Sequence, residues 1–207
     1  MSERLLCYPL WNMTPTKILE KFGGNYIATQ DTFHMGINHK LGAEIAQRFY
    51  GTETVLDTCT GAGFMTIALA RIAKHVVSVD INPEHLEMTR KNSEIAGLKN
   101  ISYILGDITD PKIIEKVGKV DSAFLDPDWA KPGDSKEIHV QDIEGMVPNG
   151  RILFELIHKI TPNIAFRLPK EIDIPALTSL PSHEIVASKI DGKIKFFTAY
   201  FGSLKRN

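Results

Sequence analysis

The chain has 207 residues, of which 43% are hydrophobic and 24% are charged, and its formal net charge is −1. This length suits one domain with a sizeable core, and the composition excludes a disordered or fibrous protein. A charge near zero excludes a protein that coats nucleic acid by overall electrostatic attraction, so any contact with RNA has to be local. The two cysteines, Cys7 and Cys59, are too few for a disulfide framework and fit a reducing compartment.

Residues 1–50 predict a helical appendage, and residues 51–207 predict the main domain. The appendage contains two helical patterns, at 14–22 and 38–50, and a loop at 32–35 between them. Its N-terminal part lacks a basic stretch followed by a long apolar run, and the longest apolar run of the chain is interrupted by an arginine. We therefore expect no signal peptide, no membrane span and a cytoplasmic location.

From residue 54 onward, short β-branched runs alternate with helical patterns, which is typical of parallel βαβ units. The predicted strands are 54–57, 75–80, 101–107, 120–126 and 163–169, and the predicted helices are 64–73, 83–97, about 136–146 and 151–160. Residues 183–202 predict two further strands around a tight turn at Asp191 and Gly192. The sequence thus predicts an α/β fold with a seven-stranded, mostly parallel sheet and an antiparallel C-terminal hairpin.

A loop with two glycines follows the first predicted strand. The segment VLDTCTGAG places Asp57 and Thr58 at the strand end and Gly61 and Gly63 before a helix. Glycine lets the backbone approach a ligand closely with positive φ, and a helix N-terminus presents free N–H groups and the positive end of a dipole. A glycine pair before a helix is also compatible with an ordinary tight turn, so the loop alone does not decide between the two interpretations.

Acidic residues end four successive predicted strands. They are Asp57, Asp80, Asp107 and Asp126. The carboxyl ends of parallel strands face one crevice, which is where open α/β sheets bind ligands. Capping of the following helices explains each acid singly, but it explains the four together less well.

S-adenosylmethionine matches this set of acids. Its ammonium group suits Asp57, its ribose diol suits Asp80 and its adenine amine suits Asp107. A nicotinamide dinucleotide is the alternative, but the third glycine of its GxGxxG fingerprint is missing, and Asp57 would repel its pyrophosphate. The predicted cofactor is therefore S-adenosylmethionine, and its predicted binding residues are Asp57, Thr58, Gly61, Gly63, Asp80, Ile81, Asp107 and Ile108.

The fourth predicted strand ends in the candidate catalytic residues Asp126, Pro127, Asp128 and Trp129. A polar side chain and a backbone carbonyl at this place can accept the hydrogens of an amine and aim its lone pair at a methyl group, while an aromatic ring stacks on a planar substrate. The tetrapeptide is also compatible with a proline turn beside a packed tryptophan.

These motifs resemble the class I S-adenosylmethionine-dependent methyltransferases, which have a Rossmann-like fold, over residues 52–201. The segments 160–177 and 193–204 further resemble the trimethylguanosine synthase family, the RNA cap guanine-N2 methyltransferases. In that family the fourth strand ends in Ser-Pro-Pro-Trp. The resemblance implies that Trp129 stacks on a guanine base and that Asp126 replaces the serine that accepts from the exocyclic amine.

Two residues depart from the family pattern. Asp128 replaces the second proline, and Lys131 stands where the family has glycine and is the second candidate substrate-binding residue beside Trp129. Asp128 is expected either to attract a cationic base, to take the amine proton after transfer, or to cap a helix. The resemblance also implies basic groups for the cap phosphates, for which the candidates are Lys17, Lys21, Lys131, Lys136 and Arg167.

The resemblance implies transfer of a methyl group from S-adenosylmethionine to the exocyclic N2 of guanine in RNA or in a nucleotide. Two alternatives stay open: a methyltransferase for a small metabolite or a protein amine, and a cofactor-binding subunit that is inactive without a partner. The seven histidines show no metal-binding spacing, and no nucleophile elbow is present, so the sequence predicts neither a metal site nor acyl transfer.

Overall fold

The computed structural model describes residues 14–130 and 139–206 of the chain. The strands are β1 (Thr54–Thr58), β2 (His75–Asp80), β3 (Ile101–Leu105), β4 (Ser122–Leu125), β5 (Ile164–Pro169), β6 (His183–Ile190) and β7 (Lys193–Phe201). The α-helices are α1 (Pro15–Phe22), α2 (Gln30–Met35), α3 (His39–Ala46), α4 (Phe64–Ala70), α5 (Pro83–Ile95), α6 (Pro111–Val117) and α7 (Gly150–His158). Short 3₁₀ helices occupy Gln47–Phe49, Ile174–Ser179 and Gly202–Leu204.

All seven strands form one sheet with the order β3-β2-β1-β4-β5-β7-β6. The pairs from β3 to β5 are parallel, whereas β7 is antiparallel to both β5 and β6. This arrangement confirms the predicted seven-stranded, mostly parallel sheet with an antiparallel C-terminal hairpin. The strand order reverses between β1 and β4, so the crevice beyond their carboxyl ends is where an open sheet of this kind binds a ligand.

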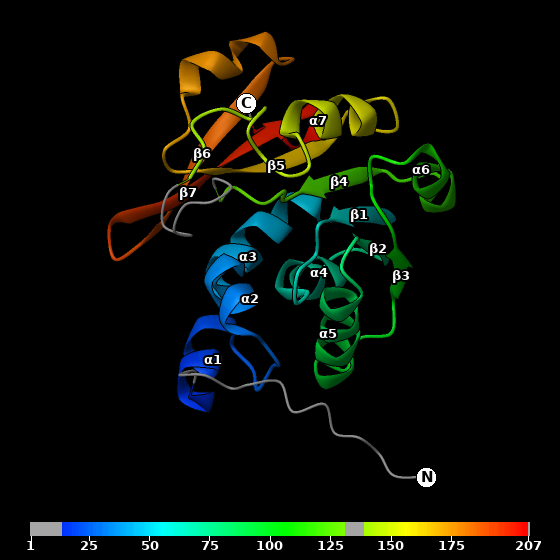
Figure 1. Cartoon of the computed structure of the whole chain (residues 1–207), viewed down its shortest axis with the longest axis vertical. Coiled ribbons are helices and arrows are strands. Elements are labelled where there is room, and N and C mark those ends of the chain that lie inside the picture. Colours follow the sequence, from blue (N-terminus) through cyan, green and yellow to red (C-terminus); the bar gives the residue numbers. More distant parts are fainter. Residues whose placement is uncertain (1–13, 131–138, 207) are drawn as a thin grey trace.

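Helices cover both faces of the sheet, as Figure 1 shows for α3, α4 and α5 on one side and α7 on the other. Leu41 and Ile45 of α3 pack with Val55 of β1 in one hydrophobic cluster. Phe154 of α7 packs with Phe166 of β5 in a second cluster. Because both faces are covered, the central strands are buried on both sides, which explains their continuous apolar runs. In the described ranges, no helix is long and apolar enough to cross a membrane.

Two of the predicted elements are wrong. Residues 30–35 form α2 rather than a loop, because Thr29 and Thr32 exchange hydrogen bonds at the start of the helix: Thr32 N–H donates to Thr29 Oγ1 at 3.2 Å, and Thr29 N–H donates to Thr32 Oγ1 at 2.9 Å. Residues 139–146 form an isolated bridge, bends and a turn rather than a helix. Their N–H groups bond outside any helical ladder, as when Gly145 N–H donates to Asp142 Oδ1 at 2.7 Å. The rest of that predicted helix, 136–138, lies outside the described residues.

Helix α6 was not among the predicted elements. Asp110 caps its start by accepting a hydrogen bond from Lys112 N–H at 2.9 Å, and Pro111 occupies the first helical position. This Asp-Pro pair is a recognised start signal for a helix. The helix was therefore visible in the sequence, but its short length of seven residues weakens any periodic pattern.

Candidate functional site

The loop after β1 has the backbone that a close ligand contact requires. Cys59, Gly61 and Gly63 all have positive φ, at 58°, 57° and 81°. Cys59 N–H donates to the carbonyl of Val79 at 2.9 Å, which ties the loop to β2. A Cβ added to Gly61 would meet no atom within 4 Å, so the backbone there borders open space. The predicted glycine loop is thus a constrained turn with one face free for a ligand.

Two buried residues of α5 hold this loop from behind. Thr89 Oγ1 donates to the carbonyl of Gly61 at 2.9 Å, and Asn92 Nδ2 donates to the carbonyl of Ala62 at 2.9 Å. Asn92 also accepts from Ile27 N–H at 2.7 Å, so it connects the loop to the segment before α2. Neither side chain was predicted as a functional residue. Polar residues in a helix are usually solvated, and only the fold shows that these two are fully buried.

Asp57 lies at the base of the loop and is 1% exposed. Thr66 Oγ1 donates to its Oδ2 at 2.5 Å. Burial raises the pKa of Asp57 to about 8, and the nearby carboxylates of Asp126 and Asp80 add to this rise, while the Thr66 hydrogen bond opposes it. A buried carboxylate of this kind is stabilised in its charged form by a cationic partner.

Asp80 ends β2 and shapes the loop directly. Its Oδ2 accepts from Gly61 N–H at 2.9 Å, and its Oδ1 accepts from Asn82 N–H at 2.9 Å. The neighbouring Ile81 is an apolar side chain that is 66% exposed. An exposed isoleucine beside a carboxylate can cover the flat face of a base while the acid binds hydroxyl groups.

Asp107 and Ile108 follow β3 and differ in their surroundings. Asp107 is exposed, and its Oδ1 accepts from the N–H and the Oγ1 of Thr109 at 2.8 and 2.7 Å. Ile108 is buried, and its side chain packs in the same core cluster as α6. The Asp107 side chain is therefore available to a ligand at this edge of the crevice, whereas the Ile108 side chain contributes to the core.

S-adenosylmethionine fits these residues. The acids Asp57, Asp80 and Asp107 lie at or just beyond the carboxyl ends of the adjacent strands β1, β2 and β3. They favour a ligand that carries positive charge and hydroxyl groups and disfavour a pyrophosphate. Thr58, the other predicted residue of the strand end, is fully buried, and its Oγ1 donates to the carbonyl of Phe124 at 3.3 Å. Thr58 thus joins β1 to β4 and holds the loop beside the candidate catalytic residues.

Asp126 follows β4, which pairs directly with β1. Its Oδ2 accepts from Arg167 Nη1 at 2.8 Å, and its side chain is 19% exposed. Burial raises the pKa of Asp126 to about 6, Arg167 opposes this rise, and Asp128 adds to it. Arg167 thus holds the Asp126 carboxylate beside the cofactor loop. The sequence did not predict this ion pair.

Asp128 is exposed, unlike Asp126. Its backbone exchanges hydrogen bonds with Val147 at 2.8 and 3.0 Å, and its Oδ1 accepts from Ala130 N–H at 3.1 Å. The Asp128 carboxylate therefore caps the turn after Trp129 and still faces solvent. Pro127 between the two acids is buried.

Trp129 is half-buried and packs against both hydrophobic clusters of the core. The Arg167 guanidinium lies 4.3 Å from its ring centroid, and the His139 ring meets it at 88° with the centroids 5.6 Å apart. Its Nε1 is buried and has no hydrogen-bond partner among the described residues. The ring is therefore held largely by packing, and its N–H group is enclosed by the protein. Lys131 and Lys136 lie outside the described residues.

Lys21 of α1 lies close to the same region. Its Nζ donates to the carbonyls of Phe33 and, at 3.3 Å, of His34. Burial and the nearby charges of Arg167 and Lys195 lower the pKa of Lys21 to about 8. A lysine that already binds the end of α2 is a structural link between the N-terminal helices and the acceptor region.

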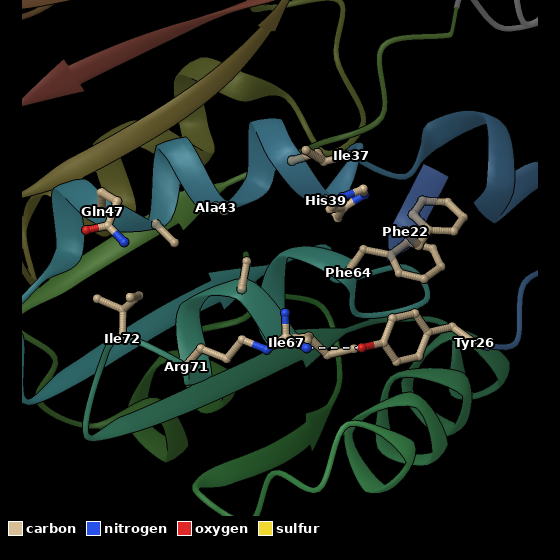
Figure 2. A pocket seen from close by; sticks show the side chains of 12 residues that line it. Phe22, Tyr26, Ile37, His39, Ala43, Gln47, Phe64, Ile67, Arg71 and Ile72 are labelled. Carbon is tan, nitrogen blue, oxygen red and sulfur yellow. Dashed lines mark hydrogen bonds between the residues drawn. The ribbon is translucent and has the colours of Figure 1, made fainter. Parts of the chain in front are cut away.

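A separate cavity of about 240 Å³ lies between α3 and α4 (Figure 2). Its walls are mostly apolar, and Arg71 Nη2 donates to the Tyr26 hydroxyl at 3.3 Å on one side. The described residues that line it do not include the predicted cofactor or acceptor residues. Within the described part of the chain, no group of three or more His, Cys, Asp or Glu residues is placed to hold a metal ion.

Replacing Asp57 by asparagine is expected to change how stability depends on pH. The folded-state pKa of Asp57, about 8, lies above its ordinary value of 3.8, so the folded chain holds an extra proton between these values. Within this window the unfolded chain has already lost the proton that the folded chain keeps. The free energy of unfolding therefore falls as the pH rises, by at most about 1.4 kcal/mol per pH unit. The Asp57→Asn variant should lose this fall, measured by urea unfolding of the cofactor-free protein from pH 5 to pH 9. Parallel profiles for the variant and the wild type would show that Asp57 does not titrate in this range.

Comparison with known proteins shows the family of the chain. The family model of the RNA cap guanine-N2 methyltransferases matches residues 52–204. An uncharacterized RNA methyltransferase of Halalkalibacterium halodurans is 39% identical over 57 residues, which are 28% of this chain and 12% of that protein. A 23S rRNA (uracil(1939)-C(5))-methyltransferase of Marinomonas posidonica is 33% identical over 79 residues, which are 36% of this chain and 17% of that protein. The chain thus matches less than a fifth of the length of these curated relatives.

Solved structures share the fold at low sequence identity. A putative methyltransferase from Porphyromonas gingivalis superimposes with a TM-score of 0.72 at 18% identity, covering 87% of this chain and 44% of that one. An O-methyltransferase from Bacillus cereus in complex with SAH superimposes with a TM-score of 0.61 at 18% identity, covering 81% and 83%. The predicted class I methyltransferase fold is confirmed. The chain belongs to the RNA cap guanine-N2 methyltransferase family, a family of S-adenosylmethionine-dependent methyltransferases.

Proposed function

We propose that this chain transfers a methyl group from S-adenosylmethionine to the exocyclic N2 amine of guanine in RNA. The observation that carries the proposal is the place of Asp126: a partly buried carboxylate, paired with Arg167, directly beyond the strand that adjoins the cofactor loop. Family membership supports the same reaction, since the matching family is that of the RNA cap guanine-N2 methyltransferases.

In this proposal bound S-adenosylmethionine would supply a methyl group on a sulfonium sulfur, which is released as a neutral thioether when the amine takes the methyl group. Asp57, Asp80 and Asp107 hold the cofactor, with the backbone of Gly61 close to it. Asp126 accepts a hydrogen bond from the acceptor amine and directs the nitrogen lone pair toward the cofactor side of the site. Most of the rate then comes from positioning the amine, as is usual for a transfer in line with a leaving group.

Two further residues have roles at the acceptor. Trp129 contacts the planar base through the exposed part of its half-buried ring. Asp128 is exposed and lies two residues from Asp126, so it can accept the proton that the methylated amine releases. The proton then passes to solvent.

Methylation of a uracil carbon is the second candidate, because some of the similar proteins carry that activity in their names. A ring carbon is a poor nucleophile until a catalytic nucleophile such as a thiolate adds to the ring. Cys59 is a free thiol, but burial and the nearby carboxylates raise its pKa well above the ordinary value, which keeps it protonated. This environment favours the amine acceptor.

The experiment is methyl transfer from deuterium-labelled S-adenosylmethionine by the purified full chain. The substrates are N7-methylguanosine-capped RNA, uncapped total RNA, and free guanine nucleotides, and the products are digested to nucleosides and identified by mass spectrometry. Labelled N2-methylguanosine is the expected product. Labelled C5-methyluridine instead would overturn the choice of base. Label in a nuclease-resistant fraction of a cell extract would indicate a metabolite or protein acceptor, and transfer only after extract is added would indicate a subunit that needs a partner.

A further inference from the structure

Arg167 on β5 connects three parts of the candidate acceptor site. Its Nη1 donates to Asp126 Oδ2 at 2.8 Å and to the carbonyl of Met35 at 3.1 Å. Its guanidinium lies over two rings, 4.3 Å from the centroid of Trp129 and 4.6 Å from that of Phe196. The Arg167 side chain is 10% exposed, so these contacts stand in for much of its hydration, although its buried Nε has no hydrogen-bond partner among the described residues.

We propose that Arg167 is a positioning residue for methyl transfer, which fixes the Asp126 carboxylate and the Trp129 ring in the acceptor site and connects both to the end of α2. This inference rests on the function proposed above. A planar guanidinium can stack on a ring while its N–H groups bond in the ring plane, which a lysine ammonium cannot do. The two acceptor residues are therefore set relative to each other by one side chain.

The N-terminal helices contribute to this arrangement. The last carbonyls of α2 face two cations: Phe33 and His34 accept from Lys21, and Met35 accepts from Arg167. Cations at the carbonyl end of a helix are stabilised by its free acceptors and its dipole. The C-terminal end of α2 thus binds Arg167 through the Met35 carbonyl. The part of the chain before residue 50 therefore takes part in forming the acceptor site.

Charge is the second contribution of Arg167. Burial and the Asp128 carboxylate in the same loop disfavour the ionised form of Asp126, and Asp126 in turn raises the pKa of Asp57 at the end of β1. Among the described residues, Arg167 forms the ion pair with Asp126, and Lys21 is close enough to Arg167 for the two charges to interact. An Asp126 that keeps its negative charge at neutral pH remains an acceptor for an amine, whereas a protonated one competes with the amine as a donor.

Arg48 provides a matched control. Its Nη1 donates to Glu184 at 2.8 Å, its guanidinium lies 4.3 Å from the Tyr200 ring, and its side chain is 10% exposed, the same fraction as for Arg167. Arg48 joins the chain before β1 to the C-terminal hairpin and is not part of the candidate site. Replacing either arginine removes a similar ion pair and a similar stacked cation.

The first measurement is the pH dependence of kcat and KM for methyl transfer by Arg167→Met, Arg167→Lys and Arg48→Met. In the wild type, kcat should fall at or below about pH 6, as Asp126 becomes protonated. In Arg167→Met, which lacks the arginine charge, the pH at which kcat falls should be higher by about 1–3 units. Arg167→Lys keeps the charge and should leave the fall near its wild-type position, with a lower maximal kcat. Arg48→Met should lower thermal stability and leave the pH profile unchanged.

The second measurement does not need the methyl acceptor. The pKa of Asp126 is followed by NMR of protein labelled with carboxyl-¹³C aspartate, and its signal is assigned by its loss in Asp126→Asn. The Asp126 pKa should rise in Arg167→Met and stay near the wild-type value in Arg48→Met. If the wild type methylates no RNA but the Asp126 pKa still rises in Arg167→Met, the proposed function fails while the charge contribution of Arg167 stands.

Two outcomes would overturn the proposal. One is an unchanged Asp126 pKa and an unchanged pH profile in Arg167→Met. The other is an increase in KM for RNA with kcat and its pH profile unchanged, which would make Arg167 a direct ligand of the substrate rather than a positioning residue. If Arg167→Met does not fold, Arg167→Gln, which keeps a stacking and hydrogen-bonding amide without charge, is tested by the same two measurements.

Discussion

Gly63→Ala is expected to lower the free energy of unfolding by about 2–5 kcal/mol, which combines the cost of a left-handed backbone with that of overpacking. Gly63 has a φ of 81°, and an added Cβ would lie 2.6 Å from Thr89 Cγ2 and 2.9 Å from Thr89 Cα. The Thr89 Cα cannot move without shifting α5, so the contact cannot be relieved by a rotamer change. The measurement is urea unfolding of the cofactor-free protein.

Two glycines with similar backbones serve as controls. Gly61 and Gly97 have φ values of 57° and 72°, and a Cβ added to either would meet no atom within 4 Å. Each alanine variant should therefore lose only about 1–2 kcal/mol of stability. Gly61→Ala should also weaken binding of S-adenosylmethionine, measured by calorimetry, whereas Gly97→Ala, which follows α5 away from the loop, should not. Equal cofactor affinities in the two variants would show that the Gly61 backbone does not approach the cofactor.

Asp126→Asn is expected to lower kcat for methyl transfer by about 100-fold, the size of effect that misplacement of a reacting group produces. Asparagine has nearly the same shape, but its amide lacks the negative charge that holds the amine. It also leaves the Arg167 charge without its carboxylate partner. The measurement is single-turnover transfer at saturating cofactor, with cofactor affinity determined separately.

Asp128→Asn is the control for this loss. Asp128 is exposed, and its Oδ1 accepts a single backbone hydrogen bond, from Ala130 N–H, which asparagine can retain. A proton acceptor open to water is readily replaced by water, so kcat should fall far less than in Asp126→Asn. If the two variants lose kcat equally, the carboxylates act as a pair, and the assignment of amine binding to Asp126 alone is wrong.

Much of the fold could be read from local patterns. The strands at 54–57, 75–80 and 163–169 are predicted within one residue of β1, β2 and β5, because each is a short β-branched or apolar run that ends in a charged residue or a proline. Helix α2 and the turns at 139–146 could not be read in the same way. The first depends on a pair of threonines and on distant cations at its end, and the second on hydrogen bonds that leave the helical ladder.

The sequence by itself determined the alternation of strands and helices, the glycine loop, and the acids that end the strands, since each is a property of neighbouring residues. Only the tertiary structure decided how these acids differ. Asp57 is buried and Asp126 is partly buried, each near other carboxylates, whereas Asp107 and Asp128 face solvent. It also decided the partner of Asp126, because Arg167 lies 41 positions away and meets it only through the pairing of β4 with β5. Burial and long-range charge depend on which strands lie side by side, and no local pattern encodes that.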